Sequence, residues 1–245
     1  MDGPAVYYSP RAWIDDCLAY APNDWRHAER WPPPGTSPHR LYLQGDGSLS
    51  TDGPNGAPRR SRYDPHRPIP TLGGRNMLID AGPRDQRPAQ SLPDYGLIYR
   101  SETLREDLTI AGAVRVTLHV QSSCPDTDFV VKLIEVEPDG RAMLLMDGVT
   151  RAMYRDPSGE PRPLVPKRIE RVTVDLGQIH HTFRGEHRLE VDVTSSNFPR
   201  RARNTNSGHP VLADDGEADI RVANNTIHHA AATPSIIELP VLTRR

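Results

Sequence analysis

A short stretch in the C-terminal part of the chain carries the side chains that a serine hydrolase uses. Asp192, Ser195, Ser196 and His187 lie close together in the sequence. A nucleophilic serine needs a base within hydrogen-bond reach and a strained turn that exposes its oxygen. All four residues follow one predicted strand, in which alternate side chains point to opposite faces. They could not converge on one substrate, so the stretch predicts a strand end and a turn, with no catalytic residue.

Two pairs of adjacent histidines, His180-His181 and His228-His229, raise the question of metal binding. Neighbouring residues of a strand face opposite ways, so each pair offers at most one ligand to any one site. No cysteine or carboxylate cluster in the sequence completes a ligand set. Surface or partly buried histidines are the expectation, and no metal ion or cofactor is expected.

Four aspartates, Asp126, Asp128, Asp139 and Asp147, could bind calcium, as some double-sheet β-proteins do. Calcium takes six to eight oxygen ligands, usually from one tight loop, and this spacing suits turns better. Asp128 precedes the apolar run Phe129-Val130-Val131 and is expected to be buried. A buried carboxylate needs a partner, for which Arg151 or Arg188 is predicted.

Two further groups of residues have both a structural and a functional interpretation. Arg200, Arg201 and Arg203 beside Asn204 are expected to form a solvated turn, with a rim that binds carboxylate or phosphate as the alternative. Trp25 and Trp31 lie in an extended, proline-rich segment. They must pack on something, and if exposed they would indicate a partner surface.

The elements that position these residues are short strands. Residues 189–192, Leu-Glu-Val-Asp, alternate apolar and acidic side chains, and Asn197 and Pro199 end that strand. Val114, Val116, Leu118 and Val120 alternate with polar residues in the same way, which is typical of a half-buried antiparallel strand. The predicted strands are residues 97–100, 113–121, 128–137, 141–154, 170–176, 187–194, 219–228 and 235–239. Turn residues separate them, which predicts an all-β protein, a jelly-roll sandwich of two antiparallel sheets.

The N-terminal part is predicted to be a loop-rich arm with short strands. The spacing of Trp13, Ile14, Cys17 and Leu18 favours a short helix over residues 12–20. Residues 41–43 with the turn 45–47 predict a strand and turn, and residues 52–93, rich in Pro, Gly and Arg, predict a long loop. We therefore expect an arm over residues 1–96 and a sandwich domain over residues 97–245.

Composition excludes several classes of function. The 245 residues carry a net charge of −2, which gives no electrostatic argument for nucleic acid or an anionic membrane as a partner. Cys17 and Cys124 fit no metal spacing, and two unpaired thiols are expected rather than a disulfide. The sequence shows no signal peptide and no run of 18 apolar residues. A cytoplasmic protein is the expectation.

Beyond these patterns, many short motifs in order resemble one family. Residues 99–104, 110–112, 126–133 and 138–140 resemble the C-terminal jelly roll of the X-prolyl dipeptidyl-peptidase and cocaine esterase family of α/β-hydrolases. The likeness continues through Asp147-Gly148, Arg151, Tyr154-Arg155, residues 185–188, 195–199, Asn204 and 229–240. Upstream, Trp25-Arg26, Trp31-Pro32, residues 63–65, Gly73-Gly74 and Asp85-Gln86 resemble the linker between the hydrolase domain and the jelly roll. Residues 9–19 and the region of Pro93-Asp94 depart from the family pattern.

The resemblance implies a domain without its own chemistry. Family members carry a Gly-x-Ser-x-Gly elbow in a preceding hydrolase domain, and this sequence contains no such motif. The expected function is to brace or shape a catalytic α/β-hydrolase domain, in cis or in trans, with the arm of Trp25 and Trp31 as the contact. The parent activity would be that of a dipeptidyl-peptidase, esterase or acylase. Contacts between copies of the chain are a further expectation, and a free-standing carbohydrate- or protein-binding module is the alternative.

Overall fold

The computed structural model describes residues 6–8, 11–14, 17–20, 26–77 and 79–243 of the chain. The helical elements in these ranges are short: α1 (Arg87–Gln90) and the 3-10 turns η1 (Ala152–Tyr154), η2 (Leu212–Asp214) and η3 (Glu217–Asp219). None of the helices in the described part of the chain is long and apolar enough to cross a membrane. All other regular structure is β-strand, which confirms the predicted fold class.

The strands before residue 96 are short, and several of the later ones are long. The first group is β1 (Val6–Tyr8), β2 (Arg11–Ile14), β3 (Cys17–Tyr20), β4 (Arg26–Ala28), β5 (Thr36–Leu43), β6 (Ser48–Ser50) and β7 (Arg59–Tyr63). The second group is β8 (Leu97–Ser101), β9 (Leu108–Ser122), β10 (Asp128–Val136), β11 (Ala142–Arg151), β12 (Glu170–Phe183), β13 (Arg188–Thr194), β14 (Ala223–Ile227) and β15 (Ile236–Leu242).

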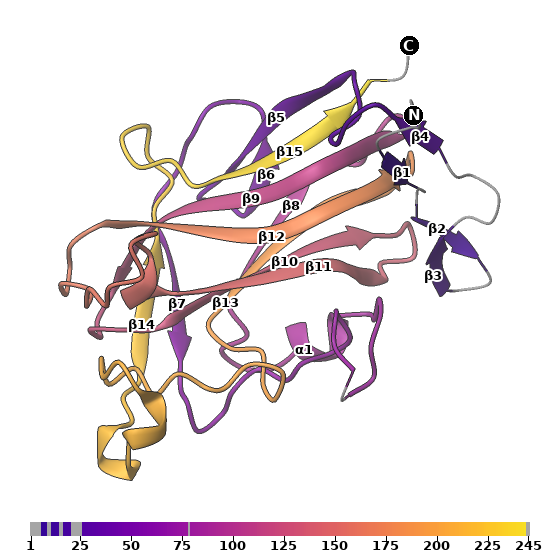
Figure 1. The fold of residues 1–245 in the computed structure, drawn as a ribbon. Coiled ribbons are helices and arrows are strands. Elements are labelled where there is room, and N and C mark those ends of the chain that lie inside the picture. Colours follow the sequence, from indigo (N-terminus) through magenta and orange to yellow (C-terminus); the bar gives the residue numbers. More distant parts are fainter. Residues whose placement is uncertain (1–5, 9–10, 15–16, 21–25, 78, 244–245) are drawn as a thin grey trace.

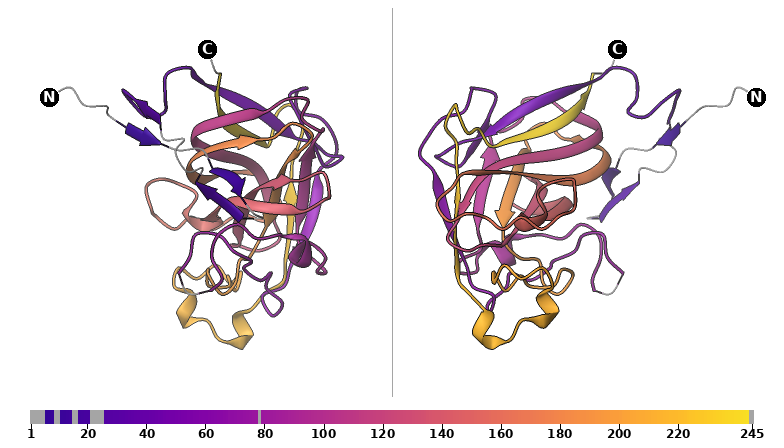
Figure 2. Two further views of the ribbon diagram at one scale, coloured as in Figure 1. Left: turned by 90° about the vertical axis from the view of Figure 1, so that its right-hand side faces the viewer. Right: turned by 60° about the vertical axis from the view of Figure 1, so that its left-hand side comes forward.

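Thirteen of the described strands form one hydrogen-bonded network in the order β11-β10-β13-β8-β6-β5-β15-β9-β12-β2-β3, with β14 joining β9 to β7. The network folds over so that β11 lies against β12 (Figures 1 and 2). The Thr150 hydroxyl of β11 donates to the carbonyl of Thr173 on β12 over 2.8 Å. The result is a jelly-roll sandwich, as predicted, and β5, β6 and β7 from before residue 96 are hydrogen-bonded into it.

The core lies between the two layers and follows the alternation seen in the sequence. Val116 and Leu118 of β9 lie opposite Val174 and Val172 of β12, and all four side chains are fully buried. Each such side chain contributes roughly 1.5–3 kcal/mol when it is removed from water. Every residue of β10 is buried, because its inner face packs on this core and its outer face is covered by another segment.

That covering layer, here called the cover segment, comprises residues 69–77 and 79–96. It crosses the outer face of β10, β11 and β13 and contains α1 (Figure 1). The backbone N–H of Gln86 donates to the carbonyl of Ala142, and that of Leu144 donates to the carbonyl of Arg84, so the segment is hydrogen-bonded along β11. Its own buried apolar residues, Ile69, Ala89 and Tyr95, form a small cluster separate from the main core.

The structure corrects several sequence-based expectations about elements. The helix predicted over residues 12–20 is wrong, because β2 and β3 occupy this part of the chain. The loop predicted over residues 52–93 contains β7 and α1. Strand β12 continues to Phe183, well past the predicted end, because a bulge at Leu176 lets pairing with β9 resume at Gly177. The strand predicted from residue 219 begins at Ala223, after the turn η3.

Candidate functional site

The residues that resemble a hydrolytic triad lie apart in the structure and have separate partners. Asp192 accepts hydrogen bonds from Tyr95 (2.5 Å) and Gln90 (3.0 Å) on the outer face of the sheet. His187 contacts the carboxylate of Glu135 at 2.9 Å. The Ser195 hydroxyl accepts a hydrogen bond from Asn225, and the Ser196 hydroxyl accepts one from the backbone N–H of Ile69. The four side chains thus contact four different partners and form no Ser–His–Asp arrangement with one another.

The histidine pairs lie in different parts of the fold: His180 and His181 belong to β12, whereas His228 and His229 follow the end of β14. His181 is buried, with its Nε2 2.9 Å from Glu135, and the same carboxylate holds His187 and the backbone N–H of Arg184. His228 contacts Gln121, whereas His229 is buried with its Nε2 3.4 Å from the Tyr99 hydroxyl. Burial lowers the pKa of His229 to about 4, which keeps the ring neutral.

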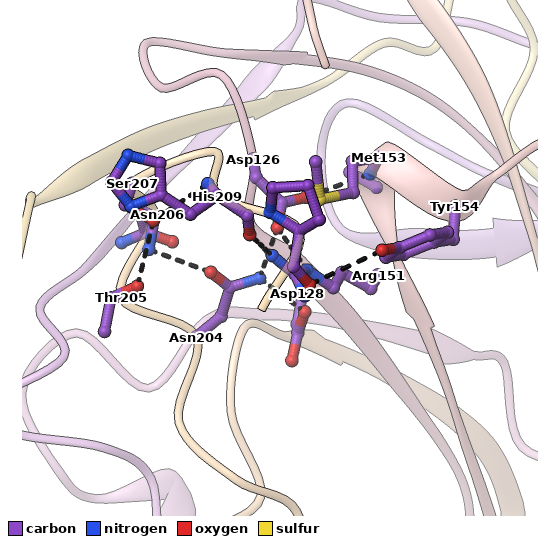
Figure 3. A network of polar contacts seen from close by, with 12 residues as sticks. Asp126, Asp128, Arg151, Met153, Tyr154, Asn204, Thr205, Asn206, Ser207 and His209 are labelled. Atoms are coloured by element: carbon purple, nitrogen blue, oxygen red, sulfur yellow. Dashed lines mark hydrogen bonds and ion pairs between the residues drawn. The ribbon is translucent and has the colours of Figure 1, made fainter. Parts of the chain in front are cut away.

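Asp126 and Asp128 meet in a buried polar network around the amide of Asn204 (Figure 3). The Asn204 Nδ2 donates to Asp126 at 2.9 Å and to Asp128 at 2.8 Å. Arg151 donates to Asp126 at 2.5 Å, and the backbone N–H of Met153 donates to the other oxygen of Asp126 at 2.9 Å. The network ties the entry to β10 to the end of β11 and to the loop after residue 200.

The predicted burial of Asp128 is confirmed, but its predicted ion pair is wrong. Arg151 pairs with Asp126 instead, and Arg188 donates to the carbonyl of Ser101. Asp128 is held by the neutral amide of Asn204. Burial raises the pKa of Asp128 to about 7; the Asn204 hydrogen bond opposes this, and the charge of Asp126 adds to it.

The four aspartates considered for calcium do not share one site. Asp147 lies on the outer face of β11, where Arg200 donates to both of its oxygens and Asn197 donates to Oδ2. Asp139 is an exposed turn residue paired with Arg141. Asp126 and Asp128 belong to the network described above. Asp147 and Asp139 each have an arginine as partner. Asp139 therefore fits the interpretation as a turn residue, and Asp147 is a member of a buried ion pair.

The run of arginines after Pro199 is only partly a solvated turn. Arg201 and Arg203 are exposed, and Arg203 donates to the carbonyl of Pro65. Arg200, in contrast, is held against the buried Asp147, with its side chain 12% exposed. An ideal Cβ on Gly74 would lie 2.8 Å from Arg200 and 3.1 Å from Asp147, so the backbone of Gly74 rests on this ion pair.

The Ser195–Pro199 motif forms a corner that holds the start of the cover segment. The backbone N–H of Phe198 donates to the carbonyl of Ile69, and the N–H of Thr71 donates to the carbonyl of Phe198. Between this corner and the cover segment lies a groove of about 900 Å³, whose apolar lining includes Leu72, Ile79, Pro83, Met143, Phe198 and Pro199. Phe198 is 42% exposed at its edge.

A narrow neck in the cover segment presents one strongly exposed apolar side chain. Gly74 and Gly82 exchange two backbone hydrogen bonds of 2.7 and 3.0 Å, which brings the two ends of the intervening loop together. Both glycines have positive φ, +87° and +84°, which side chains rarely adopt. Met77, between them, is 98% exposed. The neck belongs to the cover segment, which also lines part of the groove, and the groove is lined by charged residues such as Arg84 and Arg141 as well as by apolar ones.

Trp31 contributes to a second hollow at the opposite layer, and Trp25 lies outside the described residues. The Trp31 indole N–H donates to the Gln178 side chain at 2.7 Å. Trp31, Pro32 and Pro33 line a surface hollow of about 480 Å³ together with Pro38 and Pro240. The expectation that Trp31 packs on something is met by this proline-rich wall, which leaves the ring partly exposed.

One cluster was not foreseen from the sequence. His209, Asp215 and Asp219 each place a possible ligand atom within 4.8 Å of the others. Asp215 is also bound by Thr205, Ser207 and His209, which lowers the pKa of its carboxyl against the effect of burial. The signal in the sequence was weak, because the three residues are spread over a loop without a metal-binding spacing. Cys124 is a buried free thiol.

Comparison with protein families gives a match over nearly the whole chain. The model described as "X-Pro dipeptidyl-peptidase C-terminal non-catalytic domain" matches residues 7–238. Cocaine esterase of Rhodococcus sp. (strain MB1 Bresler) is 37% identical over 234 residues, which is 91% of this chain and 40% of that protein. A putative serine esterase of Mycobacterium bovis is 28% identical over 90% of this chain and 36% of its own length.

Solved structures agree with this relationship. An aminopeptidase from a marine sediment Thaumarchaeota archaeon superposes with a TM-score of 0.82 at 30% identity, over 90% of this chain and 39% of that one. An α-amino acid ester hydrolase gives a TM-score of 0.78 at 30% identity, over 89% of this chain and 39% of that one. The chain thus spans about two fifths of the length of these relatives. It belongs to the family of X-Pro dipeptidyl-peptidase C-terminal non-catalytic domains.

Proposed function

We propose that this domain packs against a catalytic α/β-hydrolase domain, braces it and shapes the approach to its active site. The observation that carries the proposal is the family match to residues 7–238 together with the partial coverage of every relative described above. The relatives include an esterase, an aminopeptidase and an ester hydrolase, which supports an ester- or amide-cleaving parent activity. The reaction would take place on residues of the partner domain.

Two surfaces support this packing. One comprises the groove lined in part by Phe198 and the exposed Met77 of the neck, both in or against the cover segment that packs on the Asp147–Arg200 ion pair. The other is the hollow at Trp31, which continues the arm that joins the two domains if they share one chain. Exposed apolar surface of this kind on a small domain favours a protein partner.

The first experiment asks where the chemistry resides. The isolated chain is assayed on an X-Pro-nitroanilide and on a nitrophenyl ester, and no turnover is expected. Turnover that disappears in Ser195→Ala would overturn the proposal. The coding sequence before codon 1, or beside the gene, is expected to encode the Gly-x-Ser-x-Gly hydrolase.

The second experiment measures association with that hydrolase domain, expressed separately. Met77→Asp and Trp31→Ala are each expected to weaken binding at least tenfold, because large exposed side chains commonly dominate an interface. Val165→Asp is the matched control, since Val165 is 47% exposed and lines neither the groove nor the hollow at Trp31. If the two surface variants bind the hydrolase domain as tightly as the control variant, the assigned surfaces are wrong. Dimers of the chain in the absence of the hydrolase domain would indicate contacts between copies.

A further inference from the structure

Three buried charged residues form a row across the outer face of the sheet. Lys132 on β10 lies directly opposite Asp147 on β11 and directly opposite Asp192 on β13. Residues directly opposite one another on neighbouring strands share one face. The exposed fractions are 4% for Asp147, 1% for Lys132 and 0% for Asp192. The row therefore places a lysine between two aspartates in a buried position, where burial and the charge of Glu190 raise the pKa of Asp192 to about 7 and burial lowers the pKa of Lys132.

The cover segment contacts Asp192 and Lys132 with polar groups and packs against the ion pair of Asp147. Tyr95 and Gln90 donate to Asp192. The Lys132 ammonium donates to the Gln86 side chain at 2.9 Å and lies 3.4 Å from the Tyr95 hydroxyl. Asp147 is held by Arg200, on which the backbone of Gly74 rests. Burying three charges is costly without such partners, so the cover segment and the row stabilise one another.

Gln86 connects the row to the neck that presents Met77. It is fully buried, and its Nε2 donates to the carbonyls of Leu72 (2.9 Å) and Arg84 (3.0 Å). These two residues flank the Gly74–Gly82 neck. The Gln86 Oε1 accepts from Lys132, so one side chain joins the centre of the row to both ends of the neck. Few apolar residues of the cover segment are buried, so polar contacts must set its position.

We propose that the Lys132–Gln86 contact is the positioning device of this domain: it fixes the neck that carries Met77, and with it the face offered to the partner. The two residues act through the carbonyls of Leu72 and Arg84 and touch no substrate. The inference rests on the proposed function for its consequence in binding, but the positioning itself is a property of the isolated chain.

The first test uses the isolated chain and hydrogen–deuterium exchange. Lys132→Met keeps the length of the side chain and removes the ammonium. It is expected to speed amide exchange in residues 70–90 at least tenfold, while β9 and β12 exchange as in the unmodified protein. Arg184→Met is the matched control, since it removes a cation from an exposed ion pair with Asp107, away from the cover segment and from both proposed partner surfaces. Unchanged exchange in residues 70–90, or an equal rise in all strands, would overturn the proposal.

Gln86 provides a second variant that separates the two halves of the link. Gln86→Glu keeps an acceptor for Lys132 and removes the two donors to Leu72 and Arg84. It is expected to speed amide exchange in residues 70–77 and 82–90 as Lys132→Met does, and the double variant is expected to exchange little faster than either single variant. If Lys132→Met does not fold, Gln86→Glu alone decides, and protection of these residues equal to that of the unmodified chain would contradict the inference.

The last test uses association with the separately expressed hydrolase domain. Lys132→Met and Gln86→Glu are each expected to weaken binding about tenfold, although both residues are buried and touch no partner, while Arg184→Met binds normally. If the unmodified chain does not bind the hydrolase domain, the proposed function fails. The exchange measurements still decide the positioning role, because they use the isolated chain. If the unmodified chain binds and both variants bind equally well, the positioning role fails.

Discussion

Arg151 makes its ion pair with Asp126, two residues before the buried carboxylate of Asp128. Asp126 is the central acceptor of this network, because it also receives the Met153 backbone N–H and one hydrogen of Asn204. Asp128 receives only the Asn204 amide among the described side chains. The two aspartates are close in sequence and in space, yet one is paired with a guanidinium and the other is held by a neutral amide.

Asp126→Ala is therefore expected to cost about 3–5 kcal/mol in the free energy of unfolding, because it leaves the mostly buried Arg151 guanidinium without its anion. Urea denaturation at neutral pH measures the change. Asp139→Ala, at an exposed turn, is the control and is expected to change stability by less than about 1 kcal/mol. Equal effects of the two substitutions would contradict the role given to Asp126.

Asp128 predicts a dependence of stability on pH with an unusual sign. Its pKa is raised from 3.8 to about 7, chiefly by burial, so between these values the folded protein keeps a proton that the unfolded chain releases. The folded state then binds more protons, and this residue makes stability fall as pH rises through that window. Asp128→Asn keeps the acceptor for Asn204 and cannot ionise. The stability of the variant relative to the unmodified protein is expected to rise from pH 5 to pH 8, and parallel urea curves across that range would refute the assignment.

Glu135 predicts the opposite dependence at the other end of β10. Burial acts to raise the pKa of Glu135, but hydrogen bonds and charges from His181, the N–H of Arg184 and His187 hold it below 4.5. A carboxyl of this kind adds stability above its unfolded pKa, and that stability is lost as pH falls through the folded value. Glu135→Gln is expected to cost on the order of 3 kcal/mol at neutral pH, with the difference shrinking below about pH 4. Thermal unfolding at both pH values tests this, and a pH-independent difference would count against it.

Gly148 predicts a steric effect where the two layers meet. A Cβ at this position would collide with the carbonyl oxygen of Asp175 and lie 3.1 Å from Val174, both on β12. Gly148→Ala is expected to cost about 1–3 kcal/mol, because β11 and β12 must move apart. Gly53→Ala, at a site with nothing within 4 Å, is the control in the same urea titration. A Gly148→Ala protein as stable as the Gly53→Ala control would show that β11 and β12 can move apart at this position without loss of stability.

Alternation in the sequence predicted the elements of the sandwich because one physical rule, burial of every second residue, governs them. Val114, Val116, Leu118 and Val120 are all fully buried on β9, as their spacing indicated. The same rule predicted that Asp192 and Ser195 do not converge, and in the structure the two side chains have separate partners. It failed at residues 12–20, where apolar spacing also fits a helix and the β2–β3 hairpin formed instead.

The polar layer was harder to predict, because its partners are set by strand register and by segments far apart in the sequence. Nothing local shows that Lys132 faces Asp147 and Asp192, since a lysine within an apolar run is usually expected at a surface. Arg200 was foreseen as a turn residue, but its contact with Asp147 depends on how the corner at Phe198 meets the cover segment. The signal available in the sequence for a buried charge was Lys132, in the middle of an apolar run.

The sealed position of the Asp147–Lys132–Asp192 row determines how the molecule meets dissolved ions. At about 0.15 M ionic strength, electrolyte screens exposed charges beyond roughly 8 Å, but it acts much less on pairs from which water is excluded. Salt weakens the attraction in exposed pairs such as Arg115–Asp175, whereas it has much less effect on interactions within the buried row. The contacts between the cover segment and the row are therefore expected to depend as little on salt concentration as apolar contacts do.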